Sequence, residues 1–250
     1  MKRWLVLFLL AAFFSGNARA ADPLAATAAA AWEKRADVTQ ALLAVDLYHR
    51  LAAADPKDFD SRLRVARGVY WILAELETPL DKDEKLRLYE QAIQGCNEII
   101  ARDENSAGAW NWLMWNMGAY TLERGIFSGW NLREAIVGTI MIAKTDVNYD
   151  FGGVYRHWAR VIFETPGLMG RFLHFTDDDS IWLYKKAIAV DPKYAQNHFF
   201  LGETYEKIGR PAEAKKEFDF CAALPDDALP DRVPETQLYK KMAAEKLKKL

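Results

Sequence analysis

Apolar residues along this chain recur at the spacing of helices rather than of strands. Four segments place mainly apolar side chains at steps of three, one and three positions, at residues 63–70, 110–117, 155–162 and 198–205. That spacing keeps the side chains on one face of a helix with 3.6 residues per turn. Each segment is therefore predicted to be the first helix of a helical pair.

The clearest pair is predicted at residues 193–226. Its first helix carries Leu201 and Gly202, and its second helix carries Ala214 and Phe218. Small residues at these positions let two helices cross closely, and large ones fill the gap beside the crossing. The Gly-Arg-Pro sequence at 209–211 separates the helices, with proline in the first helical turn, where it is tolerated. This is the spacing of a tetratricopeptide hairpin.

Weaker copies of the second helix occur upstream, at residues 44–56, 92–105 and 180–192. They lie farther apart than the roughly 34 residues of a standard repeat, which predicts longer helices or inserted loops. We predict an all-α fold, a tetratricopeptide-like superhelical array over residues 36–230, with connectors between the helices. The longest loop is expected at residues 165–176, followed by a helix that starts in the acidic run at 177–180.

The first twenty residues have the pattern of an export signal. A basic start at residues 2–3 precedes an apolar stretch at 4–14, which is too short to span a bilayer. A small-x-small cleavage site follows at residues 18–20. Cleavage after Ala20 predicts a periplasmic protein, and the lack of a cysteine near that junction predicts that it carries no lipid anchor.

The two ends of the mature chain differ in pattern. Residues 21–35 are rich in Ala and are predicted to be a partly disordered leader. Residues 231–250 are rich in Lys and place Leu238, Met242 and Leu247 on one stripe of a helix. Repeat arrays need terminal helices with a polar outer face, so we predict a C-terminal capping helix here.

Composition narrows the range of functions. The chain has 250 residues, of which 51% are hydrophobic, enough for a sizeable core. Its formal net charge of −2 does not indicate the basic surface that binds nucleic acid. Cys96 and Cys221 fall on helices of different repeats and are expected to be separate buried thiols.

No motif for catalysis or for a metal is present in the sequence. None of the His residues, at 49, 157, 174 and 198, pairs at the i, i+4 spacing that presents two ligands. Residues 146–152 look like the start of a calcium loop. However, Gly152 comes one place late, and His157 stands where a bidentate carboxylate is required. We predict a turn with Asx caps there, and a protein without metal, cofactor or enzymatic activity.

The first helices of stacked pairs line the concave side of such an array. Residues beside the predicted core positions are therefore expected to face a groove. They are Arg64, Trp71, Asn111, Trp115, Arg156, Arg160, Phe199 and Glu203.

The mixture of Arg and Trp in this set has two interpretations. A guanidinium can bind a carboxylate in bidentate fashion while aromatic rings cover an apolar body, which suits an organic acid. Alternatively, Trp side chains fill helix crossings and the arginines form salt bridges to Glu203 or Glu206. The sequence leaves both interpretations open.

A known family shares several of these residues in the same order. Residues 150–156 (Asp-Phe-Gly-Gly-Val-Tyr-Arg), Pro166-Gly167, Asn197-His198 and residues 201–203 (Leu-Gly-Glu) resemble the T component of tripartite ATP-independent periplasmic (TRAP) transporters. The similarity covers residues 145–225 and, more loosely, 38–144. It implies an all-helical fold with an apolar pore or cleft, and a periplasmic solute-binding protein as partner. It also implies Arg156, Asn197 and Glu203 as groove residues.

Two functions remain open at this point. One is an accessory component of solute uptake that binds a small hydrophobic or organic-acid ligand in an enclosed cavity. The other is a periplasmic scaffold whose open groove holds a protein partner. A closed pore favours the first function and an open trough the second. The sequence leaves the ligand, the partner and the oligomeric state undetermined, and a homo-oligomer is compatible with either function.

Overall fold

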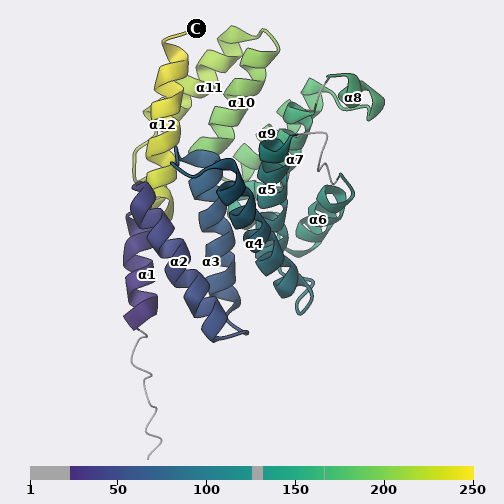
Figure 1. The fold of residues 1–250 in the computed structure, drawn as a ribbon. Coiled ribbons are helices and arrows are strands. Elements are labelled where there is room, and N and C mark those ends of the chain that lie inside the picture. Colours follow the sequence, from purple (N-terminus) through teal and green to yellow (C-terminus); the bar gives the residue numbers. More distant parts are fainter. Residues whose placement is uncertain (1–22, 126–131, 166) are drawn as a thin grey trace, which may run out of the picture.

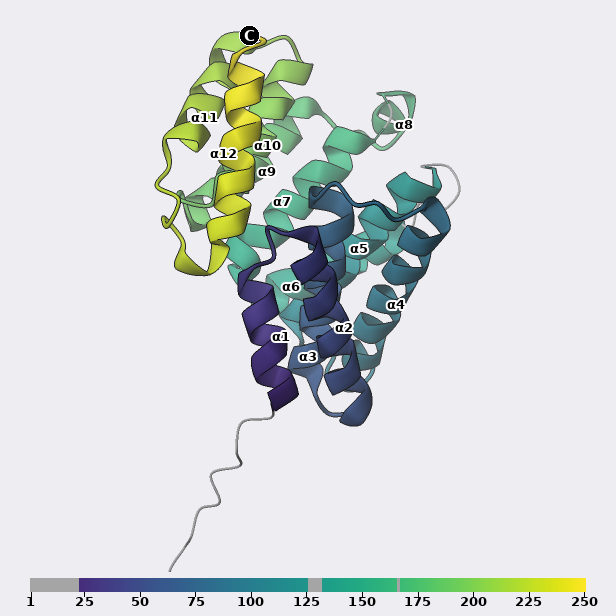
Figure 2. The same ribbon diagram turned by 60° about the vertical axis from the view of Figure 1, so that its left-hand side comes forward.

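The computed structural model describes residues 23–125, 132–165 and 167–250, and these residues form helices and no β-strand. Neighbouring helices pack in pairs, and the pairs stack side by side into a curved array (Figures 1 and 2). The predicted all-α array of helical pairs is confirmed. The expected export signal at residues 1–20 lies outside the described residues.

The helices form an inner and an outer row. The inner row consists of α3 (Phe59–Tyr70), α5 (Ala107–Arg124), α7 (Tyr149–Glu164), α10 (Ala195–Lys207) and α12 (Val233–Leu247). The outer row consists of α2 (Val38–Ala54), α4 (Lys82–Ile100), α6 (Leu132–Thr145), α9 (Asp177–Val190) and α11 (Pro211–Ala223). The remaining elements are α1 (Pro23–Glu33), the π-helical turn η1 (Trp71–Glu75), α8 (Gly167–Phe172) and the 3₁₀ turn η2 (Pro230–Arg232).

The α10–α11 hairpin confirms the pair predicted at residues 193–226. A Cβ atom at Gly202 would lie 2.5 Å from Cε1 of Phe218, so a glycine is what allows this ring to pack at the crossing. Gly209 ends α10 with a φ of +74°, and Pro211 is the first residue of α11. The small and large residues of the sequence pattern therefore have the packing roles expected of them.

Three helices lie where the sequence did not predict them. Pro23–Glu33 forms α1, so the expectation of a partly disordered leader is wrong for these residues. Close packing stabilises α1, because Ala28 and Ala31 are buried and Trp32 is 5% exposed. Helices α6 and α8 occupy segments that were expected to be a connector and a loop.

The C-terminal helix α12 contacts both ends of the array. Along its length it packs on α10 and α11. Near its start, Glu235 accepts hydrogen bonds from Arg35 (Nη2–Oε2, 2.7 Å) and from Arg67 on α3 (Nη2–Oε1, 2.9 Å). Figure 2 shows α12 close to α1 and α2. The superhelix therefore closes so that its last helix, α12, contacts the segment after α1 and helix α3. A hollow remains between the inner helices.

Candidate functional site

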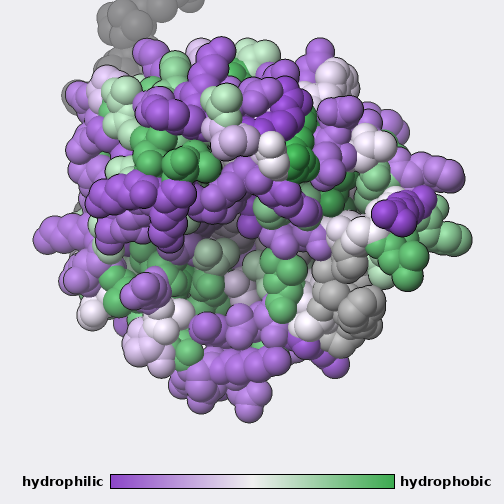
Figure 3. Space-filling view, turned by 90° about the horizontal axis from the view of Figure 1, so that it is seen from above, coloured by the Kyte–Doolittle hydropathy of each residue, from purple (hydrophilic) through white to green (hydrophobic). Residues whose placement is uncertain are grey.

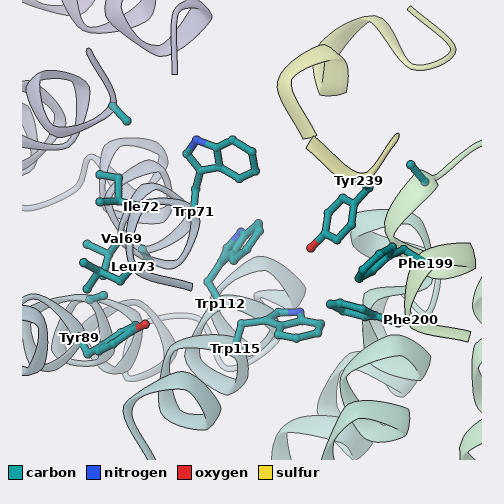
Figure 4. Close-up of a cluster of buried hydrophobic side chains, with 14 of the residues drawn as sticks. Val69, Trp71, Ile72, Leu73, Tyr89, Trp112, Trp115, Phe199, Phe200 and Tyr239 are labelled. Atoms are coloured by element: carbon teal, nitrogen blue, oxygen red, sulfur yellow. The ribbon is translucent and has the colours of Figure 1, made fainter. Parts of the chain in front are cut away.

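A pocket of about 260 Å³ lies in this hollow, and we call it the central pocket. The inner helices, together with η1, supply most of its lining, and α6 contributes Ala135. Five aromatic side chains line it: Tyr70, Trp115, Phe199, Phe200 and Tyr239. Figure 4 shows Trp115 facing Phe199, Phe200 and Tyr239. Viewed from above, the surface is largely hydrophilic, with hydrophobic residues showing around a hollow near its middle (Figure 3).

The π-helical turn η1 places a carboxylate in this aromatic lining. The backbone N–H of Leu76 bonds to the carbonyl of Trp71, and the wider turn ends α3 with Ala74 and Glu75 at the pocket. Trp71 itself points away from the pocket, and its Nε1 donates to the backbone oxygen of Arg35 at 2.8 Å. Such turns are uncommon and occur frequently at functional sites.

Glu75 is held by neutral donors. Its carboxylate accepts hydrogen bonds from the Tyr239 hydroxyl and from Nε2 of Gln196 (3.0 Å), and also interacts with the Tyr70 hydroxyl. In the described part of the chain, no Lys or Arg forms an ion pair with it. Burial raises the pKa of Glu75 above its usual value, although these hydroxyls and the more distant Arg160 and Arg156 act in the opposite direction.

Arg160 is the one guanidinium among the described lining residues of the central pocket, and both of its terminal nitrogens are paired with carboxylates. It pairs with Glu203 (Nη1–Oε2, 3.0 Å) and with Glu164 (Nη2–Oε1, 2.7 Å). Its Cζ also lies 4.6 Å from the ring centres of both Phe163 and Phe200. Burial alone would lower the pKa of Arg160, but Tyr184 and the two carboxylates raise it. Arg160 therefore stays charged, and its charge is balanced within the protein.

His157 lines the pocket in a neutral form. Its Nε2 lies 3.2 Å from the backbone oxygen of Met114, to which it can donate, and its ring packs edge-on against Trp115 at 5.2 Å. Burial lowers the pKa of His157 to about 4, because the charged imidazolium would be poorly solvated there. Among its described lining residues, the pocket thus presents three carboxylates, of Glu75, Glu164 and Glu203, against one guanidinium.

A buried group of ionic side chains lies beside the central pocket, and we call it the arginine cluster. It contains Arg35, Arg67, Arg156, Arg232, Asp150 and Glu235. Asp150 binds both Arg156 and Arg232, the latter at 2.8 Å. Burial alone would raise the pKa of Glu235, but the guanidinium groups of Arg67, Arg35 and Arg232 lower it below its usual value.

A left-handed turn presents Asp150 to this cluster. Asp150, Phe151 and Gly152 have φ values of 52°, 56° and 76°, a conformation that costs energy for the two residues with side chains. The turn exposes the carbonyl of Asp150 to Nη1 of Arg156 (3.1 Å) and that of Phe151 to Nδ2 of Asn197 (3.1 Å). The expected Asx turn just before it is present, because Asp146 accepts from the Asn148 N–H.

The structure separates the predicted groove residues into three groups. Trp115, Arg160, Phe199 and Glu203 line the central pocket. Arg156 and Asn197 lie in and next to the arginine cluster, bonded to each other at 3.0 Å.

The third group does not line the pocket. Trp71, the first residue of η1, is buried, and so is Asn111 on α5. Arg64 lies nearer the surface, where it pairs with Asp60 and contacts Tyr48. Arg156 is 1% exposed and forms hydrogen bonds on several sides. Of the two interpretations, ligand binding and salt bridging, the structure supports salt bridging for Arg156, with Asp150 as its partner.

Sequence reasoning did not identify Tyr70, Glu75, His157 or Tyr239 as pocket residues. Glu75 directly follows a predicted first helix, and Tyr239 lies on the predicted capping helix. Tyr239 could have been suggested only by knowing that the array closes on itself, and Glu75 only by knowing that the π-helical turn η1 ends α3.

Three further findings concern the cysteines, metal sites and membrane spans of the described residues. Cys96 and Cys221 are buried free thiols, and burial raises the pKa of each to about 12. Over the described ranges, no group of three or more His, Cys, Asp or Glu is placed to hold a metal ion. Nor does any helix in them have the length and hydropathy needed to cross a membrane.

Comparison with known proteins relates the fold to tetratricopeptide (TPR) proteins. TTC0263, a thermophilic TPR protein of Thermus thermophilus, has a similar structure with a TM-score of 0.57 and 16% sequence identity. The similarity covers 88% of this chain and 98% of that one. Two structures of MamA give TM-scores of 0.41, at 18% and 17% identity, over 82% and 86% of this chain and 96% and 94% of theirs.

No protein-family model matches the sequence, and no curated protein matches it either. The structural likeness at this low identity establishes the fold alone. The chain is an all-α, tetratricopeptide-like helical-repeat protein.

Proposed function

We propose that this protein is a non-enzymatic binding protein that holds a small organic molecule in the central pocket. The observation that carries the proposal is the aromatic lining of that pocket, assembled from helices α3, α5, α10 and α12. Its volume of about 260 Å³ is slightly below the roughly 300–1,000 Å³ of sites for drug-sized ligands, which fits a smaller molecule. A concave, mostly apolar site with a few polar groups is the usual form of a small-molecule site.

A pocket-filling substitution tests this proposal. Gly118 lines the pocket, and a Cβ atom added there would meet only Nε2 of His157, at 3.9 Å. Gly118→Leu should therefore occupy the pocket without a backbone clash and with better helix propensity. Gly95→Leu is the matched control, because Gly95 is also helical, lies outside the central pocket and has nothing within 4 Å of an added Cβ.

Native mass spectrometry of the three proteins purified from their host supplies the readout. A small molecule that remains bound to the wild type and to Gly95→Leu, and is absent from Gly118→Leu, is the expected result. Equal binding to all three proteins would place the ligand elsewhere and overturn the proposal.

The cellular setting that we propose follows from the sequence. The signal pattern at residues 1–20 and the resemblance of residues 150–156 to TRAP T components support a periplasmic accessory component of TRAP-type solute uptake. Its protein partner would be a periplasmic solute-binding protein. Cell fractionation with N-terminal sequencing tests export and cleavage after Ala20. Co-purification from the periplasm, with and without chemical cross-linking, tests the partner.

A second candidate function, a periplasmic scaffold for a protein partner, is favoured by exposed apolar side chains on α6 and α8. Leu168 and Phe172 on α8 are 84% and 83% exposed, and Ile140 on α6 is 47% exposed. Replacing Leu168 and Phe172 by Ser should abolish capture of a partner if this surface binds it. Loss of the partner in Gly118→Leu instead would show that the partner depends on the pocket.

A further inference from the structure

The charges around the central pocket favour one class of ligand. Glu75, Glu164 and Glu203 line it, while Arg160 is the one guanidinium among the lining residues that the structure describes. Arg160 is already paired with Glu164 and Glu203 and stacked on Phe200. A carboxylate ligand would have to displace one of these acidic groups before it could bind Arg160.

Glu203 and Glu164 each pair with Arg160, whereas Glu75 forms no ion pair within the described residues and is affected by Arg160 and Arg156 only at a distance. Glu203 also lies 3.6 Å from Nζ of Lys246, which binds Glu206 at 2.6 Å. Glu75 receives hydrogen bonds from the Tyr239 hydroxyl and the Gln196 amide, and neither donor carries a positive charge. Glu75 is partly buried, and a carboxylate withdrawn from bulk water with hydrogen bonds from neutral donors is stabilised further by a cation at the position of its remaining lone pairs.

Aromatic rings line the pocket together with Glu75, and aromatic rings can bind an ammonium group. Tyr70 and Trp115 lie with ring centres 5.1 Å apart, and Phe200 and Tyr239 with ring centres 5.8 Å apart. The negative faces of aromatic rings attract ammonium groups, and rings arranged as a cage are a recurrent way to bind them. Arg160 over Phe200 shows that a cation already sits on one ring of this set.

We propose that the ligand of the central pocket is an organic cation, a protonated amine on an apolar body, whose ammonium group binds the carboxylate that η1 presents at Glu75. This inference rests on the proposed function and makes it specific. It also replaces the organic acid expected from the sequence, because the arginines on which that expectation depended, Arg156 and Arg160, are both bound to carboxylates. The apolar body would lie among Trp115, Phe199 and Phe200.

Three probes with the same apolar body and different charge test the inference. They are 2-phenylethylamine, which is a cation at neutral pH, 2-phenylethanol, which is neutral, and 3-phenylpropionate, which is an anion. Isothermal titration calorimetry on the wild-type protein at neutral pH should show the amine binding at least about tenfold more tightly than either other probe. A hydrogen bond to a charged group is worth that factor or more.

A matched pair of variants then locates the charge. Glu75→Gln keeps the shape of the side chain and removes its charge, and it should reduce the preference for the amine by about tenfold or more. Glu206→Gln, outside the pocket lining, should leave that preference unchanged. Circular dichroism and thermal melting check that both variants fold. If Glu75→Gln does not fold, the comparison of the three probes on the wild-type protein still tests the inference.

The outcomes separate this inference from the proposed function. Tightest binding of the phenylpropionate or of the phenylethanol would overturn the cation inference and leave a small-molecule pocket. An amine preference that survives Glu75→Gln would also overturn it. If none of the three probes binds the wild type, and Gly118→Leu purified from the host retains the same molecules as the wild type, the proposed function fails as well.

Discussion

Arg35 and Glu235 are 200 residues apart in the chain, and their side chains form a buried, two-pronged ion pair with Nη2–Oε2 at 2.7 Å and Nε–Oε1 at 3.3 Å. Arg35 follows α1, and Glu235 lies in the first turn of α12. The pair therefore ties the first helices of the array to the last one. Together with the packing of α12 on α10 and α11, this contact holds Tyr239 at the hollow, where it completes the lining of the central pocket.

Removing the carboxylate of this pair should destabilise the whole fold. Glu235→Ala would leave the guanidinium groups of Arg35, Arg67 and Arg232 buried without that partner. Breaking a buried ion pair from one side typically costs about 3–5 kcal/mol of unfolding free energy. Urea denaturation followed by circular dichroism measures the loss.

A surface pair supplies the control for this prediction. Asp219 binds Lys215 on α11 at 2.6 Å, and the two side chains are 51% and 60% exposed. Because solvent screens such pairs, Asp219→Ala should leave the urea midpoint nearly unchanged. Equal losses for Asp219→Ala and Glu235→Ala would mean that ring closure does not depend on the Arg35–Glu235 pair.

Arg156 should prove structural rather than ligand-binding. Its guanidinium reaches Asp150, Asn197 and two backbone carbonyls of the left-handed turn. Lys keeps the charge but cannot form this planar fan of hydrogen bonds. Arg156→Lys should lower the unfolding free energy by about 1–3 kcal/mol, measured by chemical denaturation. Unchanged stability together with weaker ligand binding would contradict this role and return Arg156 to the ligand site.

His157 gives stability a predictable dependence on pH. Its pKa in the folded protein is about 4, below the ordinary 6.5, so protonation favours the unfolded chain. The contribution is fully present above about pH 6.5 and is lost as the pH falls towards 4, by up to about 3 kcal/mol.

The variant His157→Gln isolates this effect, because Gln can donate to the Met114 carbonyl and does not titrate. The difference in unfolding free energy between wild type and variant should narrow or reverse as the pH falls from 6.5 to 4. A difference that stays constant over this range would show that His157 is not buried in its neutral form. Comparing the two proteins removes the contributions of Glu75 and Glu235, which titrate in both.

The crossing of α10 and α11 should not tolerate a side chain at residue 202. The Cβ atom of any replacement would meet the Phe218 ring at 2.5 Å. Gly202→Leu should therefore reduce the unfolding free energy by about 1–3 kcal/mol. Adding Phe218→Leu, which shortens the opposing side chain, should recover part of the loss. Additive losses in the double variant would indicate that the two residues do not share this crossing.

The sequence predicted the parts of the fold that depend on local packing. The α10–α11 pair was recognisable because Gly202 and Phe218 have complementary sizes at the spacing of a helix crossing. Helix α1 was missed because its Ala-rich sequence has no apolar periodicity, although small residues are what lets it pack closely on α2. Helix α6 was missed because Ile136, Val137 and Ile140 remain exposed, so its pattern does not mark one buried face.

The candidate site was only partly predictable for a different reason. Trp115, Arg160, Phe199 and Glu203 were accessible to sequence reasoning, because helix periodicity places them on the concave side of the array. Glu75 enters the pocket through a π-helical turn, and Tyr239 enters through closure of the ring. Neither event has a signature in the spacing of nearby residues, because both depend on contacts between distant parts of the chain.

A crystal structure of the protein purified directly from its host tests the central claim most directly. The account predicts electron density for one small organic molecule among Trp115, Phe200 and Tyr239, with a polar group towards Glu75. The same density should be absent from crystals of Gly118→Leu. A central pocket that contains only water in the wild type, or the same molecule bound at another surface in both proteins, would contradict the account.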